Sequence, residues 1–190
     1  MFDATVRAVI ERVHKLREQV TDHYQVPAEE GLFLAQLVRI GRSKLICEIG
    51  TSYGFSTLHL AAAAREHGGH VHTIDVLQKK YDAARKHLGE AGLLDTVTQH
   101  LGDARQVIPG INAGTGFYFV FIDATKEQSF GYLEAVLPKL APRAVLATDN
   151  TRTHAKELAS FIEHLRRLPH AQSCDVPIGN GVELTVITRP

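Results

Sequence analysis

The chain has 190 residues, of which 44% are hydrophobic and 22% charged, enough to bury one core and typical of a globular protein. Lysine and arginine together number 21, as do aspartate and glutamate, so no net basic charge favours nucleic acid or an anionic membrane. No apolar run reaches bilayer-spanning length and the polar N-terminal segment is unlike a signal peptide, so we expect no membrane partner and a cytoplasmic location.

Helical and strand patterns alternate along almost the whole chain. Apolar positions at helical spacing predict a helix over about 2–20. A second helix, expected over 27–40, opens with proline in its first turn and two acids against the positive end of the helix dipole. Strands are predicted at 44–49, 70–75, 96–101, 117–122, 143–148, 171–176 and 182–188, with helices at 56–67, 78–89, 104–108, 127–140 and 155–168.

Strands separated by helices of this size form right-handed βαβ units, so the pattern predicts an α/β fold with helices on both faces of a mostly parallel sheet. The last two strands are joined by a tight turn and should pair antiparallel. We expect one domain over 1–190, with N-terminal helices in 1–40 and a core in 44–188.

Three histidines and two cysteines are candidates for a metal site that the spacing does not favour. His67, His70 and His72 surround a helix-to-strand turn without a carboxylate or cysteine, so we expect a solvated turn. Cys47 and Cys174 lie far apart, and Cys47 falls inside an apolar strand, where it should be a small buried hydrophobe in a reducing compartment.

Two predicted strands end at carboxylates. Residues 119–122 lead to Asp123, with Lys126 three residues later, and residues 144–148 lead to Asp149 and Asn150. If both strands are parallel in one sheet, three oxygen ligands and one amine meet at the same edge. Such a set suits a divalent cation beside a base and indicates an enzyme.

The turn after the first strand bears glycines that allow close approach of a ligand. Gly50 and Gly54 are spaced G-x-x-x-G rather than G-x-G-x-x-G, which disfavours a pyrophosphate-binding dinucleotide fold. Ser56 or Thr57 could cap the next helix. Glu48, beneath the loop, would repel a pyrophosphate and attract an ammonium or sulfonium group.

The next two strands also end in acids. Asp75 could bind both hydroxyls of a ribose, and Asp103 with the backbone N–H of Ala104 could read an adenine edge. Each acid has a structural alternative, because Asp75 could simply end a strand in a turn and Asp103 could cap a helix. Acids at three successive strand ends together favour a ligand site.

These segments together resemble a known family. Residues 26–31, 48–57, 73–75, 121–126 and 149–150 are similar to the corresponding stretches of class I S-adenosylmethionine-dependent methyltransferases. They resemble more specifically the cation-dependent O-methyltransferases of the catechol and caffeoyl-CoA type. The resemblance implies a Rossmann-like methyltransferase fold, with a seven-stranded sheet whose last strand is antiparallel.

The resemblance also implies roles for individual residues. Asp123, Asp149 and Asn150 would hold Mg²⁺, or Ca²⁺ or Mn²⁺, and Lys126 would be the catalytic base. The acceptor would be a small catechol-like aromatic with vicinal hydroxyls. A phenol titrates near 10, so ionising it at pH 7 costs about 4 kcal/mol, which a cation and a base would offset. The residues expected to bind S-adenosylmethionine are Val26, Glu48, Gly50, Ser52, Ser56, Asp75, Asp103, Ala104 and Asp123.

The acceptor side departs from the family pattern. Asn180 stands where Asp is usual, and residues 141–144 replace a usual Pro-Gly-Gly. The stretch 151–154 is short, so it must wall the acceptor pocket alone. We therefore expect an open site or one completed by a partner subunit, and a homodimer. Tyr24 and Phe55 could line the pocket or simply pack.

Three other functions stay open. Methylation of a hydroxylated tRNA base is disfavoured by the balanced charge, although a basic cluster prevents its exclusion. A nucleotide-dependent α/β oxidoreductase is disfavoured by the glycine spacing. A non-catalytic binding module is disfavoured by the intact set of acids and lysine. The basic cluster comprises Arg152, Lys156, Arg166 and Arg167.

Overall fold

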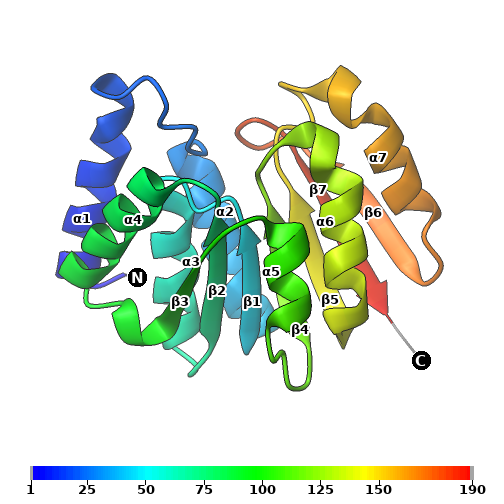
Figure 1. Ribbon diagram of the computed structural model, residues 1–190, viewed down its shortest axis with the longest axis horizontal. Coiled ribbons are helices and arrows are strands. Elements are labelled where there is room, and N and C mark those ends of the chain that lie inside the picture. The colour runs from blue at the N-terminus through cyan, green and yellow to red at the C-terminus, as the bar shows by residue number, and fades with distance from the viewer. Residues whose placement is uncertain (1, 189–190) are drawn as a thin grey trace.

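The computed structural model describes residues 2–188, which build one seven-stranded sheet with helices on both faces (Figure 1). The strand order is β3-β2-β1-β4-β5-β7-β6, and β7 is antiparallel to both of its neighbours. This confirms the predicted fold. The strands are β1 (Leu45–Ile49), β2 (His70–Asp75), β3 (Val97–Leu101), β4 (Phe117–Ile122), β5 (Leu140–Thr148), β6 (Ala171–Val176) and β7 (Val182–Thr188).

The helices divide into two layers, each covering its own buried cluster. One layer consists of α1 (Ala4–Lys15), α2 (Ala28–Gly41), α3 (Phe55–Arg65) and α4 (Gln78–Glu90). The other consists of α5 (Ala104–Gly110), α6 (Ser129–Val136) and α7 (Ala155–Arg167). Short 3₁₀ turns lie at Leu16–Glu18, Leu94–Thr96, Lys126–Gln128 and Leu137–Lys139. Within residues 2–188, no helix is both long and apolar enough to cross a membrane.

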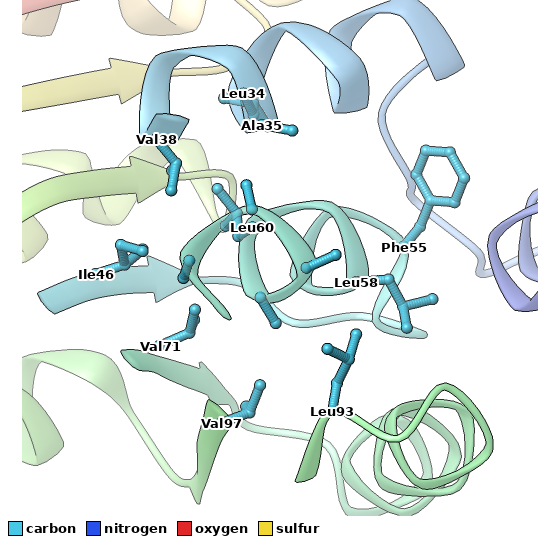
Figure 2. Close-up of a cluster of buried hydrophobic side chains, with 14 of the residues drawn as sticks. Leu34, Ala35, Val38, Ile46, Phe55, Leu58, Leu60, Val71, Leu93 and Val97 are labelled. Atoms are coloured by element: carbon cyan, nitrogen blue, oxygen red, sulfur yellow. The ribbon is translucent and has the colours of Figure 1, made fainter. Parts of the chain in front are cut away.

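Helix α3 is buried from Phe55 to Ala64, as its alanine-rich, all-round apolar sequence predicts. Figure 2 shows its side chains between α2 and the strands β1, β2 and β3. Contact with α2 is close, since a Cβ on Gly31 would lie 2.9 Å from the His59 ring. This packing fixes the N-terminus of α3, which begins directly after the glycine-bearing loop at Gly54.

Three boundary predictions were wrong for local reasons. The first helix ends at Lys15, and a 3₁₀ turn follows it. The helix expected over 127–140 ends at Val136, because Pro138 lacks an N–H and Leu140 already pairs with Phe117. Strand β5 therefore starts three residues earlier than predicted, and it accommodates Pro142 where the register shifts between Phe117 and Phe119.

The expected solvated histidine turn is also wrong. His70 and His72 belong to β2 and are half-buried against the neighbouring strand β3. His70 Nε2 lies 2.8 Å from Thr98 Oγ1, and His72 Nδ1 lies 2.9 Å from His100 Nε2. Burial, followed by the charges of its histidine neighbours, lowers the pKa of His72 to about 4, so the ring is neutral at pH 7. In residues 2–188, no three His, Cys, Asp or Glu side chains are grouped to hold a metal ion.

The functional edge of the sheet forms because each strand end bonds to the next. Gly50 N donates to Ile74 O at 2.9 Å, Asp123 N to Ile49 O at 2.9 Å, and Asp149 N to Ile122 O at 3.0 Å. These three backbone bonds continue the parallel ladders one residue beyond the strands. They place the glycine loop and both acidic strand ends side by side at the carboxyl edge of the sheet, where open α/β sheets bind ligands.

Candidate active site

A cavity of about 870 Å³ opens at this edge and extends from the end of β3 to the end of β5. Three residues predicted to bind the cofactor, Val26, Glu48 and Ser56, are buried and lie outside its lining. The other predicted site residues all line the cavity: Gly50, Ser52, Asp75, Asp103, Ala104, Asp123, Lys126, Asp149 and Asn150.

The glycine loop requires its glycine. Gly50 has φ +103°, and a Cβ there would lie 1.9 Å from the backbone oxygen of Asp123. The loop also orients the acid at the end of β2, because Ser52 N donates to Asp75 Oδ2 at 2.8 Å and Leu77 N donates to Oδ1 at 3.0 Å. Asp75 is thus held by two backbone amides at the cavity wall, the position expected of a ribose ligand.

Glu48 supports the loop from below rather than lining the cavity. The hydroxyls of Thr57 and Thr73 donate to its Oε2 at 2.5 and 2.6 Å. Burial raises the pKa of Glu48 to about 7, against the lowering effect of these hydrogen bonds. Neither Ser56 nor Thr57 caps α3, whose N-cap is Gly54, so that prediction was wrong. Thr57 instead joins α3 to β1 through Glu48.

Asp103, the acid after β3, already has hydrogen-bond partners within the protein. Asp103 caps α5 by accepting from Arg105 N at 2.9 Å, so the helix-cap alternative holds for this residue. The Arg105 guanidinium also donates to both carboxylate oxygens, at 2.5 to 3.1 Å. Hydrogen bonding from Arg105 lowers the pKa of Asp103, which lines the cavity as a carboxylate. Arg105 was not among the predicted site residues, although its position two residues after Asp103 allows its side chain to reach that carboxylate.

The acids at the ends of β4 and β5 meet as expected. Lys126 Nζ donates to Asp123 Oδ1 at 3.1 Å, and both side chains are mostly buried. Asp149 is 1% exposed and accepts from the backbone N–H of Asn150 at 2.5 Å. Asn150 takes a left-handed conformation with φ +68°, and its amide donates to Thr153 Oγ1 at 3.2 Å. The tight turn holds Asn150 beside Asp149.

A further carboxyl group, unrecognised in the sequence, lies beside Asp149. Glu30, on the first turn of α2, is fully buried, and its Oε2 accepts from Asn180 N at 3.2 Å. Burial raises the pKa of both groups, with a smaller contribution from neighbouring carboxylates. In the sequence, Glu30 was interpreted only as an acid that stabilises the positive end of the helix dipole. Its burial depends on how α2 packs, which the sequence pattern does not show.

The donor set fits a hard divalent cation. Asp123, Asp149 and Asn150 offer only oxygen atoms, which suit Mg²⁺, Ca²⁺ or Mn²⁺ better than zinc. Burial raises the pKa of Asp149, the negative charge of Asp123 adds to this effect, and Lys126 only partly offsets it. A dication between these groups would balance that charge.

The N-terminal segment 22–25 covers the cofactor side of the cavity. Ser52 Oγ donates to His23 O at 2.6 Å, and the Tyr53 hydroxyl donates to Asp22 at 2.9 Å. Tyr24 lines the cavity and is 72% exposed, with the Lys80 ammonium 4.8 Å from its ring centre. Lys80 is buried and lines the cavity, and it was not among the predicted site residues. By contrast, Phe55 packs in the core.

The acceptor side is walled by short segments. Thr153 and His154 line it, as expected of the short 151–154 stretch, together with Glu157 of α7 and Asn180 of the β6–β7 turn. The basic cluster nearby is largely neutralised, since three of its arginines form ion pairs. These pairs are Arg152–Asp175, Arg166–Glu183 and Arg167–Glu163, and they weaken the case for tRNA.

The sheet order, the glycine loop and the acidic strand ends define a Rossmann-like class I methyltransferase. The chain belongs to the O-methyltransferase family, which matches residues 5–187. These findings identify a S-adenosylmethionine-dependent O-methyltransferase.

Individual relatives agree with this assignment. A catechol O-methyltransferase of Mycobacterium tuberculosis is 37% identical over 125 residues, which cover 66% of this chain and 56% of that protein. Caffeoyl-CoA O-methyltransferase 1 of Arabidopsis thaliana is 26% identical, over 92% of this chain and 77% of that protein. The crystal structure of the O-methyltransferase TomG of Streptomyces achromogenes, in complex with SAM, matches with a TM-score of 0.83 and 26% identity, over 99% and 91% of the two chains.

Proposed function

We propose that the protein is a divalent-cation-dependent O-methyltransferase that transfers a methyl group to one hydroxyl of a small catechol-like aromatic. The observation that carries the proposal is a single cavity in which Asp123, Asp149 and Lys126 lie beside the glycine loop. Relatives named for catechol and caffeoyl-CoA support an acceptor with vicinal phenolic hydroxyls.

The cofactor would occupy the β1–β3 end of the cavity. S-Adenosylmethionine supplies a methyl group on a positively charged sulfur, which a hydroxyl oxygen takes by direct displacement. Asp75 would bind the ribose hydroxyls, and Gly50 leaves room for the backbone to approach. Ala104 and Asp103 would border the adenine. Glu48 would act through the loop it supports, because its carboxylate is held by Thr57 and Thr73.

The acceptor would bind at the β4–β5 end. Asp123, Asp149 and Asn150 would hold Mg²⁺ or a similar cation, which stabilises an anionic oxygen by several kcal/mol. Lys126 would act in its neutral form, after its ammonium group has released a proton to water. Nζ would then exchange its hydrogen bond to Asp123 for one to the acceptor and take the hydroxyl proton. Thr153, His154 and Asn180 would border the ring.

We further propose a cytoplasmic homodimer. Cys47 is buried and Cys174 is exposed, and neither is in a disulfide in the part of the chain described, in keeping with a reducing compartment. The short acceptor wall supports a partner subunit that would complete the site. Sedimentation at several concentrations would test the dimer.

The proposal is tested by binding and turnover. Calorimetry should detect S-adenosylmethionine but not NAD, and methyl transfer to a catechol should require Mg²⁺. Phenol, which lacks the second hydroxyl, is the matched acceptor and should react at least tenfold more slowly than catechol. Full activity in EDTA would remove the cation from the function, while equal rates on phenol and catechol would remove the vicinal acceptor.

A further inference from the structure

Glu30 is a buried acid that the proposed reaction does not use. It lies on the first turn of α2 with no exposed surface, whereas its neighbour Glu29 is exposed. Asn180 N, in the β6–β7 turn, donates to Glu30 Oε2 at 3.2 Å, while Glu30 Oε1 is buried and has no hydrogen-bond partner among residues 2–188. Burying a carboxyl group is expensive, and glutamate is rarely buried completely. What this burial secures is a contact between segments 150 residues apart in sequence.

The β6–β7 turn fits between α2 and the segment 151–153 because a glycine lies on each side of Asn180. Gly179 has φ +53°, and a Cβ on it would lie 2.3 Å from Glu30 Oε2. Gly181 has φ +88°, and a Cβ on it would lie 2.5 Å from Arg152 Cγ and 2.9 Å from Arg152 N. A side chain at either glycine would push the turn away from one of its two neighbours.

The backbone of Asn180 joins these two neighbours. Its N–H donates to Glu30 Oε2, and its carbonyl oxygen accepts from Arg152 N at 3.1 Å and from Thr153 N at 3.4 Å. Glu30 on α2 is therefore linked through one residue of the turn to the segment that follows the end of β5.

The linked segments border the acceptor side of the cavity. Asn180, Thr153 and His154 line the cavity, whereas Glu30 lies outside its lining. Neither 151–154 nor 177–181 is part of a helix or strand, so few backbone hydrogen bonds hold them. Segments of this kind open most easily, and their order depends on contacts with better-packed elements. Helix α2, which packs on α3, is such an element.

We propose that Glu30 is a positioning residue for the methyl acceptor: it ties the acceptor wall, residues 151–154 and 177–181, to α2. The wall is then already ordered when the acceptor binds. Ordering a loop on binding weakens affinity, and a loop that is ordered beforehand avoids this loss. The inference rests on the proposed catechol-like acceptor, and Glu30 acts through the backbone of Asn180.

The first measurement is amide hydrogen exchange of the whole protein without acceptor, followed by NMR. Glu30→Ala should speed exchange at least tenfold at Arg152, whose own hydrogen-bond acceptor is unchanged by the substitution. The amides of Gly50 and Asp123, which continue the parallel ladders, should exchange as in the wild type. Faster exchange confined to the wall would show that Glu30 orders it.

The second measurement is the kinetics of methyl transfer to catechol. Glu30→Ala should raise the KM for catechol at least tenfold and leave kcat within threefold, because the wall contributes to binding rather than to the chemical step. Glu30→Gln should keep KM within threefold of the wild type, since an amide oxygen still accepts from Asn180 N. Glu29→Ala, exposed on the same turn, is the matched control. S-Adenosylhomocysteine affinity should be unchanged in all three variants.

A further variant approaches the same contact from the turn and does not depend on whether Glu30→Ala folds. Gly179→Ala should displace the turn from Glu30, speed exchange at Arg152 and raise the KM for catechol at least tenfold. Gly114→Ala is its control, because Gly114 has φ +52° and no atom within 4 Å of an added Cβ. The backbone strain is similar in both variants, so a difference between them reports the contact with Glu30.

Four results would overturn the inference. Unchanged exchange at Arg152 in Glu30→Ala and Gly179→Ala would show that the wall is ordered without Glu30. Faster exchange with an unchanged KM would show that the acceptor does not use the wall. A parallel loss of kcat or of S-adenosylhomocysteine affinity would show a general structural role. A wild type that binds S-adenosylhomocysteine but does not methylate catechol would overturn the proposed acceptor and this inference with it, a failure that the wild-type assay alone distinguishes from the other three.

Discussion

The acids at the two ends of the cavity differ in their hydrogen-bond and ion-pair partners. At the cofactor end, two backbone amides hold the two oxygens of Asp75. Two threonine hydroxyls donate to Glu48 Oε2, while Glu48 Oε1 is buried without a hydrogen-bond partner among residues 2–188. At the cation end, Asp123 and Asp149 line the same cavity, with Lys126 as a partial counter-charge. The cofactor end is therefore organised by the backbone before any ligand binds, whereas the cation end carries negative charge suited to a positive partner.

Lys126→Ala should have the largest effect and should be confined to the cation end. Turnover is expected to fall about 10²- to 10⁴-fold, the usual contribution of a general base. The affinity for S-adenosylmethionine should stay within twofold, as measured by calorimetry. Lys156→Ala, an exposed lysine on α7, serves as the control. Turnover close to that of the wild type would remove Lys126 from the chemistry.

Asp149→Ala should separate the two ends of the cavity. Loss of a cation ligand should weaken Mn²⁺ binding by about 100-fold or more, while S-adenosylhomocysteine still binds through the backbone-organised end. Adding EDTA should then reduce turnover of the variant no further. If EDTA still lowers its rate as much as that of the wild type, the cation binds elsewhere.

Asp75→Ala is the mirror experiment at the cofactor end. Removing the proposed ribose contacts should weaken S-adenosylhomocysteine binding at least tenfold, because even one hydrogen bond to a charged group contributes about 1.5–3 kcal/mol. Mn²⁺ affinity should be unchanged, since no hydrogen bond joins Asp75 to the cation ligands in the range described. A parallel loss of Mn²⁺ binding would mean that the two ends are coupled through the glycine loop.

The smallest expected effect is on stability in mild acid. It concerns α3, which begins directly after the glycine loop. Burial lowers the pKa of His59 to about 4, from an ordinary value near 6.5. The unfolded chain therefore binds a proton that the folded chain resists, and stability is lost as the pH falls below about 6.5. Between pH 7 and 5.5, His59 alone should lower the free energy of unfolding by about 1 kcal/mol.

Urea unfolding at both pH values checks this expectation. His59→Gln should remove about 1 kcal/mol of the pH dependence and leave the part due to His72, whose pKa burial also lowers to about 4. His164→Gln, on the exposed face of α7, should leave the pH dependence as in the wild type. An unaltered slope in His59→Gln would assign the acid sensitivity to another group.

Residues at strand ends were predictable because parallel strands finish at one edge of a sheet. Alternating apolar strands and helices were enough to bring Asp75, Asp123 and Asp149 together without knowing any side-chain contact. Predictions failed where a residue's role depended on a distant partner. Ser56 and Thr57 looked like caps, yet Thr57 hydrogen-bonds with Glu48 in the strand before the loop.

The sequence by itself determined the fold class, the carboxyl edge of the sheet as the site and nine of the residues that line the cavity, because local periodicity and chain connectivity dictate all three. Only the tertiary structure decided which partners the buried acids have. Glu30 reaches Asn180 because α2 packs beside α3 and because Gly179 leaves space for a carboxyl group. Contacts between residues so far apart in sequence leave no periodic pattern, so packing alone reveals them.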